Sequence, residues 1–126
     1  MGEKNLELLR ERRRMRSKVL KEVKEWARSL PFKSTVILVG SYARGDFNLW
    51  SDIDVVVIAG FKGNPVERLR GIEHPPGFEV IPLTPEEFAV LLSKRNPLTL
   101  EALERGVVLR DDLNFRKSFK TRIQGG

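Results

Sequence analysis

The sequence contains no cysteine and only one histidine, and these two absences limit the sites that it can form. Without cysteine there is neither a disulfide framework nor a thiolate metal site, and a single histidine excludes a multi-histidine zinc site. Any metal ion must therefore be bound by oxygen. Long apolar runs are also missing, because the longest, Val55 to Gly60, is too short to span a bilayer. The charged N-terminus does not resemble a signal peptide, so we expect a cytoplasmic protein with no membrane partner.

A length of 126 residues fits one domain. We expect a single domain over 1–126, divided into a long basic helix over 1–30, strands with the candidate catalytic residues over 33–83, and C-terminal helices over 84–126. No room is left for a separate substrate domain. Whatever the protein modifies is therefore expected to arrive on another molecule.

The formal net charge is +6 and the isoelectric point is near 10, which predicts an anionic partner. The positive charge is concentrated at the two ends of the chain, and the stretch from Arg10 to Arg16 is especially rich in arginine. Three interpretations remain open: a solvated helix face, contact with RNA phosphates through the basic N-terminal helix, or contact with an acidic partner surface.

Periodicity and helix-breaking residues divide the chain into helices and strands. Strands are expected at 35–39, 52–58 and 78–83, because these runs are short, largely apolar and rich in β-branched residues. Helices are expected at 4–30, 41–44, 64–70, 111–124, and after Thr84-Pro85 and Pro97. The order predicts an α/β (α+β) domain.

Three carboxylates are candidate metal ligands. Asp52 and Asp54 project from the same side of a strand, because side chains alternate along it, and Glu79 on the next strand can join them. Oxygen donors of this kind suit Mg²⁺, and two such ions can assist phosphoryl transfer. The alternatives are a solvated strand start for the two aspartates and an exposed strand residue for Glu79.

A Gly-Ser turn follows the first strand. Gly40 lets a phosphate approach the backbone, and the helix turn that begins at Ser41 offers free N–H groups and a hydroxyl. Arg44 lies one turn further on and is expected either to bind the same phosphate or to form a salt bridge with Asp46. Triphosphate on one side and metal on the other would define a nucleotide site.

The segment from Gly40-Ser41-Tyr42-Ala43-Arg44 to Ser51-Asp52-Ile53-Asp54 resembles the signature of the minimal nucleotidyltransferases (MNT) of the DNA polymerase β superfamily. The resemblance implies a small mixed sheet with helices packed on it. It also implies transfer of a nucleoside monophosphate, AMP from ATP, with two Mg²⁺ ions and release of pyrophosphate. Asp52, Asp54 and Glu79 would bind metal and act in catalysis, whereas Gly40, Ser41 and Arg44 would hold the nucleotide phosphates.

The same resemblance suggests a partner, because many such enzymes pair with a helical HEPN protein in toxin–antitoxin systems. The expected acceptor is then a tyrosine of a HEPN-type toxin. The alternatives are a non-catalytic antitoxin subunit that acts by binding, and nucleotidyl transfer to a small molecule or an RNA end. Whether the protein is a homo-oligomer is left open by the sequence.

Overall fold

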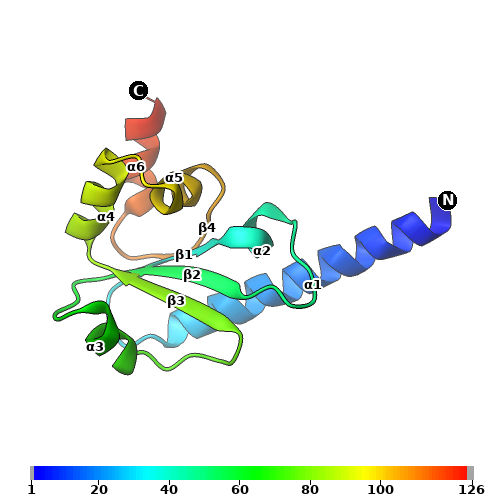
Figure 1. Cartoon of the computed structure of the whole chain (residues 1–126), viewed down its shortest axis with the longest axis horizontal. Helices are drawn as coiled ribbons and strands as arrows, with labels where there is room; N and C mark the ends of the chain where they lie inside the picture. Colours follow the sequence, from blue (N-terminus) through cyan, green and yellow to red (C-terminus); the bar gives the residue numbers. More distant parts are fainter. Residues whose placement is uncertain (1, 125–126) are drawn as a thin grey trace.

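A computed structural model of the chain describes residues 2–124, with side chains described as far as residue 119. This part of the chain forms six helices and four strands, which are drawn in Figure 1. Their bounds are α1 Gly2–Ser29, β1 Thr35–Val39, α2 Gly40–Arg44, β2 Ile53–Ile58, α3 Pro65–Arg70, β3 Phe78–Leu83, α4 Pro85–Ser93, α5 Pro97–Glu104, β4 Val107–Asp111 and α6 Phe115–Gln124.

The four strands form one mixed sheet in the order β3-β2-β1-β4. Strand β1 is antiparallel to β2 and to β4, and β2 is parallel to β3. The predicted α/β class with a small mixed sheet is therefore confirmed. Pro82 lies in β3, which is an edge strand of the sheet. Edge strands tolerate proline, because a residue without a backbone N–H need not bond to a further strand there.

Strand β4 is the main departure from the predicted arrangement, which had only helices after residue 84. Val107 to Leu109 lie in this part of the chain and have no predicted element, but the structure pairs them with the open edge of β1, with Ile37 opposite Val108. The physical reason is that β1 is fully buried, so its second edge needs a hydrogen-bonding neighbour. Short half-buried segments of this kind give little periodic signal.

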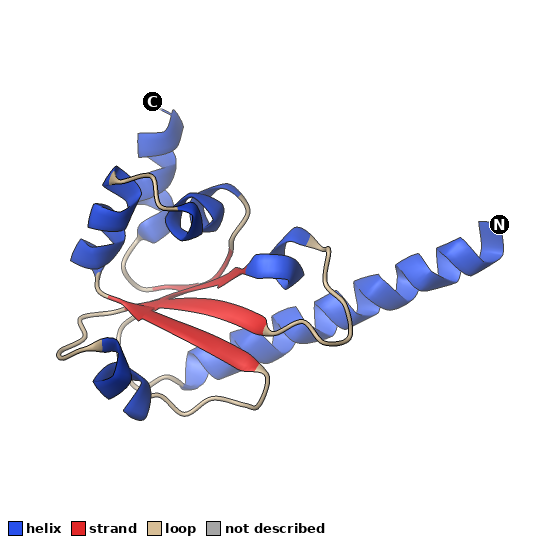
Figure 2. Ribbon diagram, in the orientation of Figure 1, coloured by secondary structure: helices blue, strands red, loops and turns tan. Residues whose placement is uncertain are grey.

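Helices cover both faces of the sheet (Figure 2). Helix α1 packs on one face through Val19, Val23 and Trp26, which join Leu38 and Val55 in one apolar cluster. The opposite face carries a second cluster from helices α4, α5 and α6, with Ile37, Val39, Val56, Phe88, Ala102 and Phe115. Burial of each such Val, Ile or Phe side chain contributes about 1.5–3 kcal/mol. The sheet is thus a rigid layer on which side chains can be placed reproducibly.

The predicted helix starts are confirmed at α4 and α5. Thr84 and Glu87 form a reciprocal capping box in front of α4, with Pro85 in the first turn. Asn96 accepts a hydrogen bond from the N–H of Leu98 at the start of α5. The Asn96 cap fixes where α5 begins, and therefore which side chains of α5 face the sheet.

Helix α1 extends beyond the body of the domain. Its C-terminal half is packed on the sheet, whereas its N-terminal half extends past the sheet into solvent (Figure 1). Leu6, Leu8 and Leu9 on the extension are each more than half exposed. No helix in the described chain has the length and apolar content needed to cross a membrane.

Candidate active site

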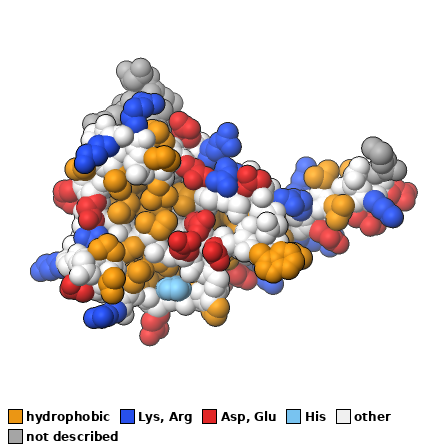
Figure 3. Space-filling view, viewed as in Figure 1, with side chains coloured by type: hydrophobic (Ala, Val, Ile, Leu, Met, Phe, Trp, Pro, Cys, Tyr) orange, Lys and Arg blue, Asp and Glu red, His pale blue; other side chains and the backbone are white. Residues whose placement is uncertain are grey.

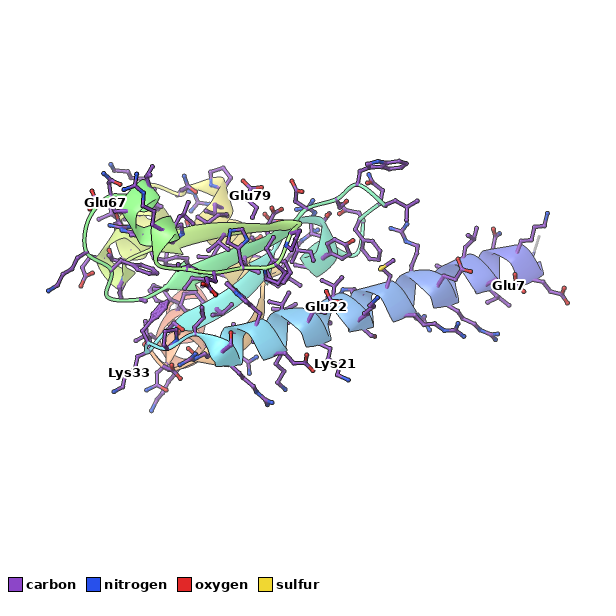
Figure 4. The ribbon with its side chains drawn as sticks, turned by 90° about the horizontal axis from the view of Figure 1, so that it is seen from below. Glu7, Lys21, Glu22, Lys33, Glu67 and Glu79 are labelled. Atoms are coloured by element: carbon purple, nitrogen blue, oxygen red, sulfur yellow. The ribbon has the colours of Figure 1, made fainter. Side chains whose placement is uncertain are left out.

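Asp54 and Glu79 are direct neighbours across the parallel pair β2–β3. Both belong to the set of strand positions that includes Val56 and Ile81, on the face covered by α4 to α6. They line a cavity of about 200 Å³ together with Val39, Gly40, Ile81, Leu98 and Glu101. Figure 4 shows Glu79 pointing away from α1, and Figure 3 shows carboxylates gathered on this side of the molecule. The sheet register thus brings together two predicted site residues that are far apart in sequence.

The environment of Asp54 raises the pKa of its carboxyl group from 3.8 to about 6. Partial burial is the largest cause, followed by hydrogen bonding with Glu79 and by the negative charges of Glu79, Asp52 and Glu101. Crowded carboxylates are destabilised when all are ionised. A bound cation would relieve that repulsion, and carboxylate oxygens are the type of donor that a hard divalent ion such as Mg²⁺ prefers.

Asp52 stands immediately before β2, which begins at Ile53 rather than at Asp52 as expected. Ile53 points to the opposite face of the sheet and packs against the cluster beneath α1. Asp52 itself is exposed and acts on Asp54 only through its charge. Among the described residues, no three His, Cys, Asp or Glu side chains are grouped closely enough to hold a metal ion. The metal roles of Asp52, Asp54 and Glu79 therefore stay predictions.

Gly40 is the point of contact between the turn after β1 and the carboxylate of Asp54. Its φ angle is +75°, a conformation that favours glycine. A Cβ atom at this position would lie 2.3 Å from Oδ2 of Asp54, so any other residue would force the Asp54 carboxylate to move. The glycine therefore allows the backbone of the Gly-Ser turn to lie directly against the acidic pair.

Ser41 follows in the first turn of α2 and is half-buried. Its carbonyl oxygen accepts hydrogen bonds from the N–H groups of Gly45 and Asp46, at 2.7 and 3.1 Å, which closes the short helix as predicted. The Ser41 hydroxyl makes no hydrogen bond to any described residue. It is therefore available to a ligand.

Arg44 forms ion pairs with two carboxylates, Asp46 at 3.1 Å and Glu101. Hydrogen bonds to Asp46 and Glu101 raise the pKa of its guanidinium group further above the usual value. The salt bridge to Asp46, one of the two predicted interpretations, is present. The other, phosphate binding, stays a prediction and would require Arg44 to leave at least one of its present partners.

Glu101 is a site residue that the sequence analysis missed. It lies on α5, far from the Gly-Ser and Asp-Ile-Asp segments in sequence, and it lines the same cavity as Asp54. Glu101 lies one turn from Leu98 and beside Ala102, on the buried side of α5. This helical spacing was the only feature of the sequence that pointed to Glu101. That signal shows that a carboxylate faces inward but not what it meets.

Two arginines of the arginine-rich segment turn inward and hold the end of α2. Arg16 donates from Nε to the carbonyl of Tyr42 at 2.8 Å and from Nη2 to that of Ala43 at 3.1 Å. Arg12 donates from Nη2 to the carbonyls of Gly45 and Phe47, at 3.1 and 2.8 Å. The first three of these carbonyls lie at the C-terminal end of α2, where helix carbonyls lack internal partners, and that of Phe47 lies in the loop that follows. The long helix thereby fixes the helix that carries the Gly-Ser turn.

A second, larger hollow lies on the other side of α2. It has a volume of about 470 Å³ and lies between the extended half of α1 and the loop 47–50. Tyr42 stacks on Phe47 at its base, with ring centroids 4.4 Å apart, whereas Trp50 and Leu49 are more than 80% exposed. This groove is apolar and separate from the acidic cavity.

Comparison with known proteins identifies the family of the chain. Residues 16–123 match the family model described as a nucleotidyltransferase domain. The chain belongs to the nucleotidyltransferase domain family. It is 34% identical over 100 residues to the Methanocaldococcus jannaschii protein named "Putative protein adenylyltransferase", an alignment that covers 71% of this chain and 67% of that protein.

A solved structure is similar as well. It is the crystal structure of "a putative nucleotidyltransferase from Sulfolobus solfataricus", with 26% sequence identity and a TM-score of 0.50. The match covers 79% of this chain and 83% of that one. The resemblance to the minimal nucleotidyltransferases of the polymerase β superfamily is thus confirmed, and the chain is a nucleotidyltransferase.

Proposed function

We propose that this nucleotidyltransferase transfers AMP from ATP to a hydroxyl group of another protein, with Mg²⁺ as cofactor and pyrophosphate as the second product. The observation that supports the proposal most strongly is the contact of the Gly40 turn with the paired carboxylates Asp54 and Glu79. Triphosphate and metal ligands would then meet at one point. The name of the Methanocaldococcus relative supports AMP and a protein acceptor.

In this proposal the acceptor oxygen attacks the α-phosphorus of ATP, and the bond from that phosphorus to the oxygen bridging to the β-phosphorus breaks. Mg²⁺, when bound by Asp52, Asp54 and Glu79, supplies positive charge to the attacking and leaving oxygens. Glu79, more exposed than Asp54, stands where it can take the proton of the acceptor hydroxyl. Gly40 and Ser41 would bind the β and γ phosphates, and Arg44 would join them after release from Glu101.

The test uses the purified chain with Mg²⁺ and ATP labelled either at the α or at the γ phosphate, incubated with a cell extract separated into protein, RNA and small-molecule fractions. We expect α label on a protein, no γ label there, and release of labelled pyrophosphate. Asp52→Asn/Asp54→Asn should abolish the label, whereas Glu104→Gln, an exposed carboxylate on α5, should retain it. Equal labelling by the double variant would disprove the catalytic proposal.

We also propose a HEPN-type helical protein as the acceptor, through a tyrosine. This part of the proposal rests on the family resemblance alone. Mass spectrometry of the labelled protein identifies the modified residue, and label on RNA or on a small molecule would instead select one of the alternative acceptors.

A second candidate function is that of a binding subunit, and the apolar groove beside Trp50 and Leu49 favours it. Large apolar side chains exposed at the rim of a groove are typical of protein interaction sites. If binding alone matters, Asp52→Asn/Asp54→Asn should neutralise a co-expressed toxin as well as the wild type does. Loss of neutralisation by that variant would instead favour catalysis.

A further inference from the structure

A large excess of positive charge lies in a short part of α1, one of the two basic ends of the chain. Residues 10–21 contain seven arginines and lysines and one glutamate, a balance of +6. The whole chain has the same formal charge of +6, so the remaining residues balance to zero. A charge excess of this density on a single helix creates a strong local positive potential.

The basic side chains of α1 divide between two faces of the helix. Arg16 donates to two carbonyls of α2 and Arg12 donates to those of Gly45 and Phe47 just after it, so both arginines face the domain. Six of the other basic residues recur at spacings of three, four or seven on the opposite side, which places them in one row at 100° per residue. We call this row the outer stripe; it consists of Arg10, Arg13, Arg14, Lys21, Lys24 and Arg28.

The outer stripe has no intramolecular function in the described chain. All of its residues are exposed, and none forms an ion pair with a described carboxylate. Figure 4 shows the labelled Lys21 pointing away from the sheet. Of the glutamates between residues 10 and 28, Glu11 and Glu22 fall on another side of the helix, and Glu25, one turn from Lys21 and Arg28, forms an ion pair with neither. The charges are therefore uncompensated and free to meet an anionic surface.

We infer that the outer stripe binds the phosphate backbone of a double-helical nucleic acid. From Arg10 to Arg28 the stripe extends about 27 Å at 1.5 Å per residue, the length of about eight base pairs. The aromatic residue of α1, Trp26, is buried, so the stripe offers no stacking platform for unpaired bases. A straight row of cations without such a platform matches regularly spaced phosphates. The stripe lies on the side of the sheet opposite the acidic cavity, and the inference does not depend on the proposed reaction.

The test measures fluorescence anisotropy of labelled RNA and DNA duplexes of about 20 base pairs, and of single-stranded RNA of the same length, at several salt concentrations. The wild type should bind a duplex at 50 mM salt more tightly than the single strand. Arg10→Gln/Arg13→Gln/Arg14→Gln should weaken duplex binding about tenfold or more. It should also reduce the steepness of log K against log salt by about two to three, because each lost phosphate contact contributes about 0.9.

The matched control removes the same number of charges elsewhere on the surface, as Lys62→Gln/Arg70→Gln/Arg105→Gln, and should change duplex affinity less than threefold. Gln preserves helix propensity, and circular dichroism verifies that both triple variants are folded. Comparison of the RNA and DNA duplexes identifies which nucleic acid is preferred. Equal losses for both triple variants, or no duplex binding by the wild type at 50 mM salt, would overturn the inference. So would binding to vesicles of anionic lipid without binding to either duplex.

Discussion

The acidic cavity and the outer stripe of α1 are both strongly charged, and they are built differently. In the cavity, sheet register places Asp54 beside Glu79. Partial burial and the neighbouring charge of Glu79 then raise the pKa of Asp54. On the stripe, cations stand in water with no described partner. The function of the cavity therefore depends on the exact positions of its carboxylates, whereas that of the stripe depends on the number and spacing of its charges. A single substitution should therefore abolish the function of the cavity but only weaken that of the stripe.

The largest expected effect is that of Asp54→Asn on catalysis. The variant removes one of the two paired carboxylates, and loss of a metal ligand or of its charge should lower nucleotidyl transfer about 1,000-fold. Duplex binding should change less than twofold, because the stripe is remote. The assay is α-label transfer together with duplex anisotropy on the same preparation. Retention of more than a tenth of the transfer rate would contradict the assigned role.

Gly40→Ala sharpens the comparison by testing placement without a change of charge. The added methyl group meets Asp54 and the backbone has a positive φ, so we expect a loss of about 2–3 kcal/mol in the free energy of unfolding. Nucleotidyl transfer should fall at least as strongly as with Glu79→Gln.

Gly45→Ala is the matched control for Gly40→Ala. Gly45 also has a positive φ, of 93°, but a Cβ there meets no atom within 4 Å. It should therefore show only the backbone cost of about 1 kcal/mol. Urea unfolding of both variants gives the comparison, and equal losses would show that the contact with Asp54 is unimportant.

Arg16→Gln and Arg14→Gln test the two faces of α1 against each other. Arg16→Gln removes two hydrogen bonds to α2 carbonyls, so we expect a loss of about 1–3 kcal/mol in stability and weaker ATP binding. Arg14→Gln should cost less than about 0.5 kcal/mol and leave ATP binding unchanged. Chemical denaturation and calorimetric titration of ATP measure both effects. Identical behaviour of the two variants would mean that the inward contacts do not position α2.

The smallest expected effect is a pH dependence of stability. The pKa of Asp54 is raised from 3.8 to about 6 in the folded state, so its contribution to stability is fully present below pH 3.8 and is lost as pH rises through about 6. In metal-free buffer at pH 8, Asp54→Asn should therefore be more stable than the wild type by on the order of 1 kcal/mol, with allowance for solvent screening. The difference should vanish near pH 3.5.

Thermal unfolding across this pH range, with Glu104→Gln as the control carboxylate, measures that dependence. Added Mg²⁺ should stabilise the wild type more than Asp54→Asn, because the cation offsets the repulsion that the amide removes. A stability difference between wild type and Asp54→Asn that is the same at pH 3.5 and pH 8 would disagree with the raised pKa.

The sequence predicted those parts of the molecule that depend on local patterns. Short apolar runs rich in β-branched residues located β1, β2 and β3, and Thr84 with Pro85 located the start of α4. The family signature led directly to Gly40 and Asp54, and parallel pairing then placed Glu79 beside them as expected.

What the sequence could not predict depends on contacts between distant segments. Strand β4 forms only because the open edge of β1 is available, and Glu101 reaches the cavity only because α5 packs over the sheet. The inward turn of Arg12 and Arg16 was hidden within a run that reads as a uniform charge cluster. Long-range packing decides such placements, and one sequence alone contains no local signal for it.

The most direct test of the central claim is a crystal structure of the chain with Mn²⁺ and a non-hydrolysable ATP analogue. We predict an anomalous peak in contact with the carboxylates of Asp54 and Glu79, and triphosphate density at the backbone of Gly40 and Ser41. Manganese bound elsewhere, with the triphosphate away from the Gly-Ser turn, would contradict the assignment of this cavity as the site of nucleotidyl transfer.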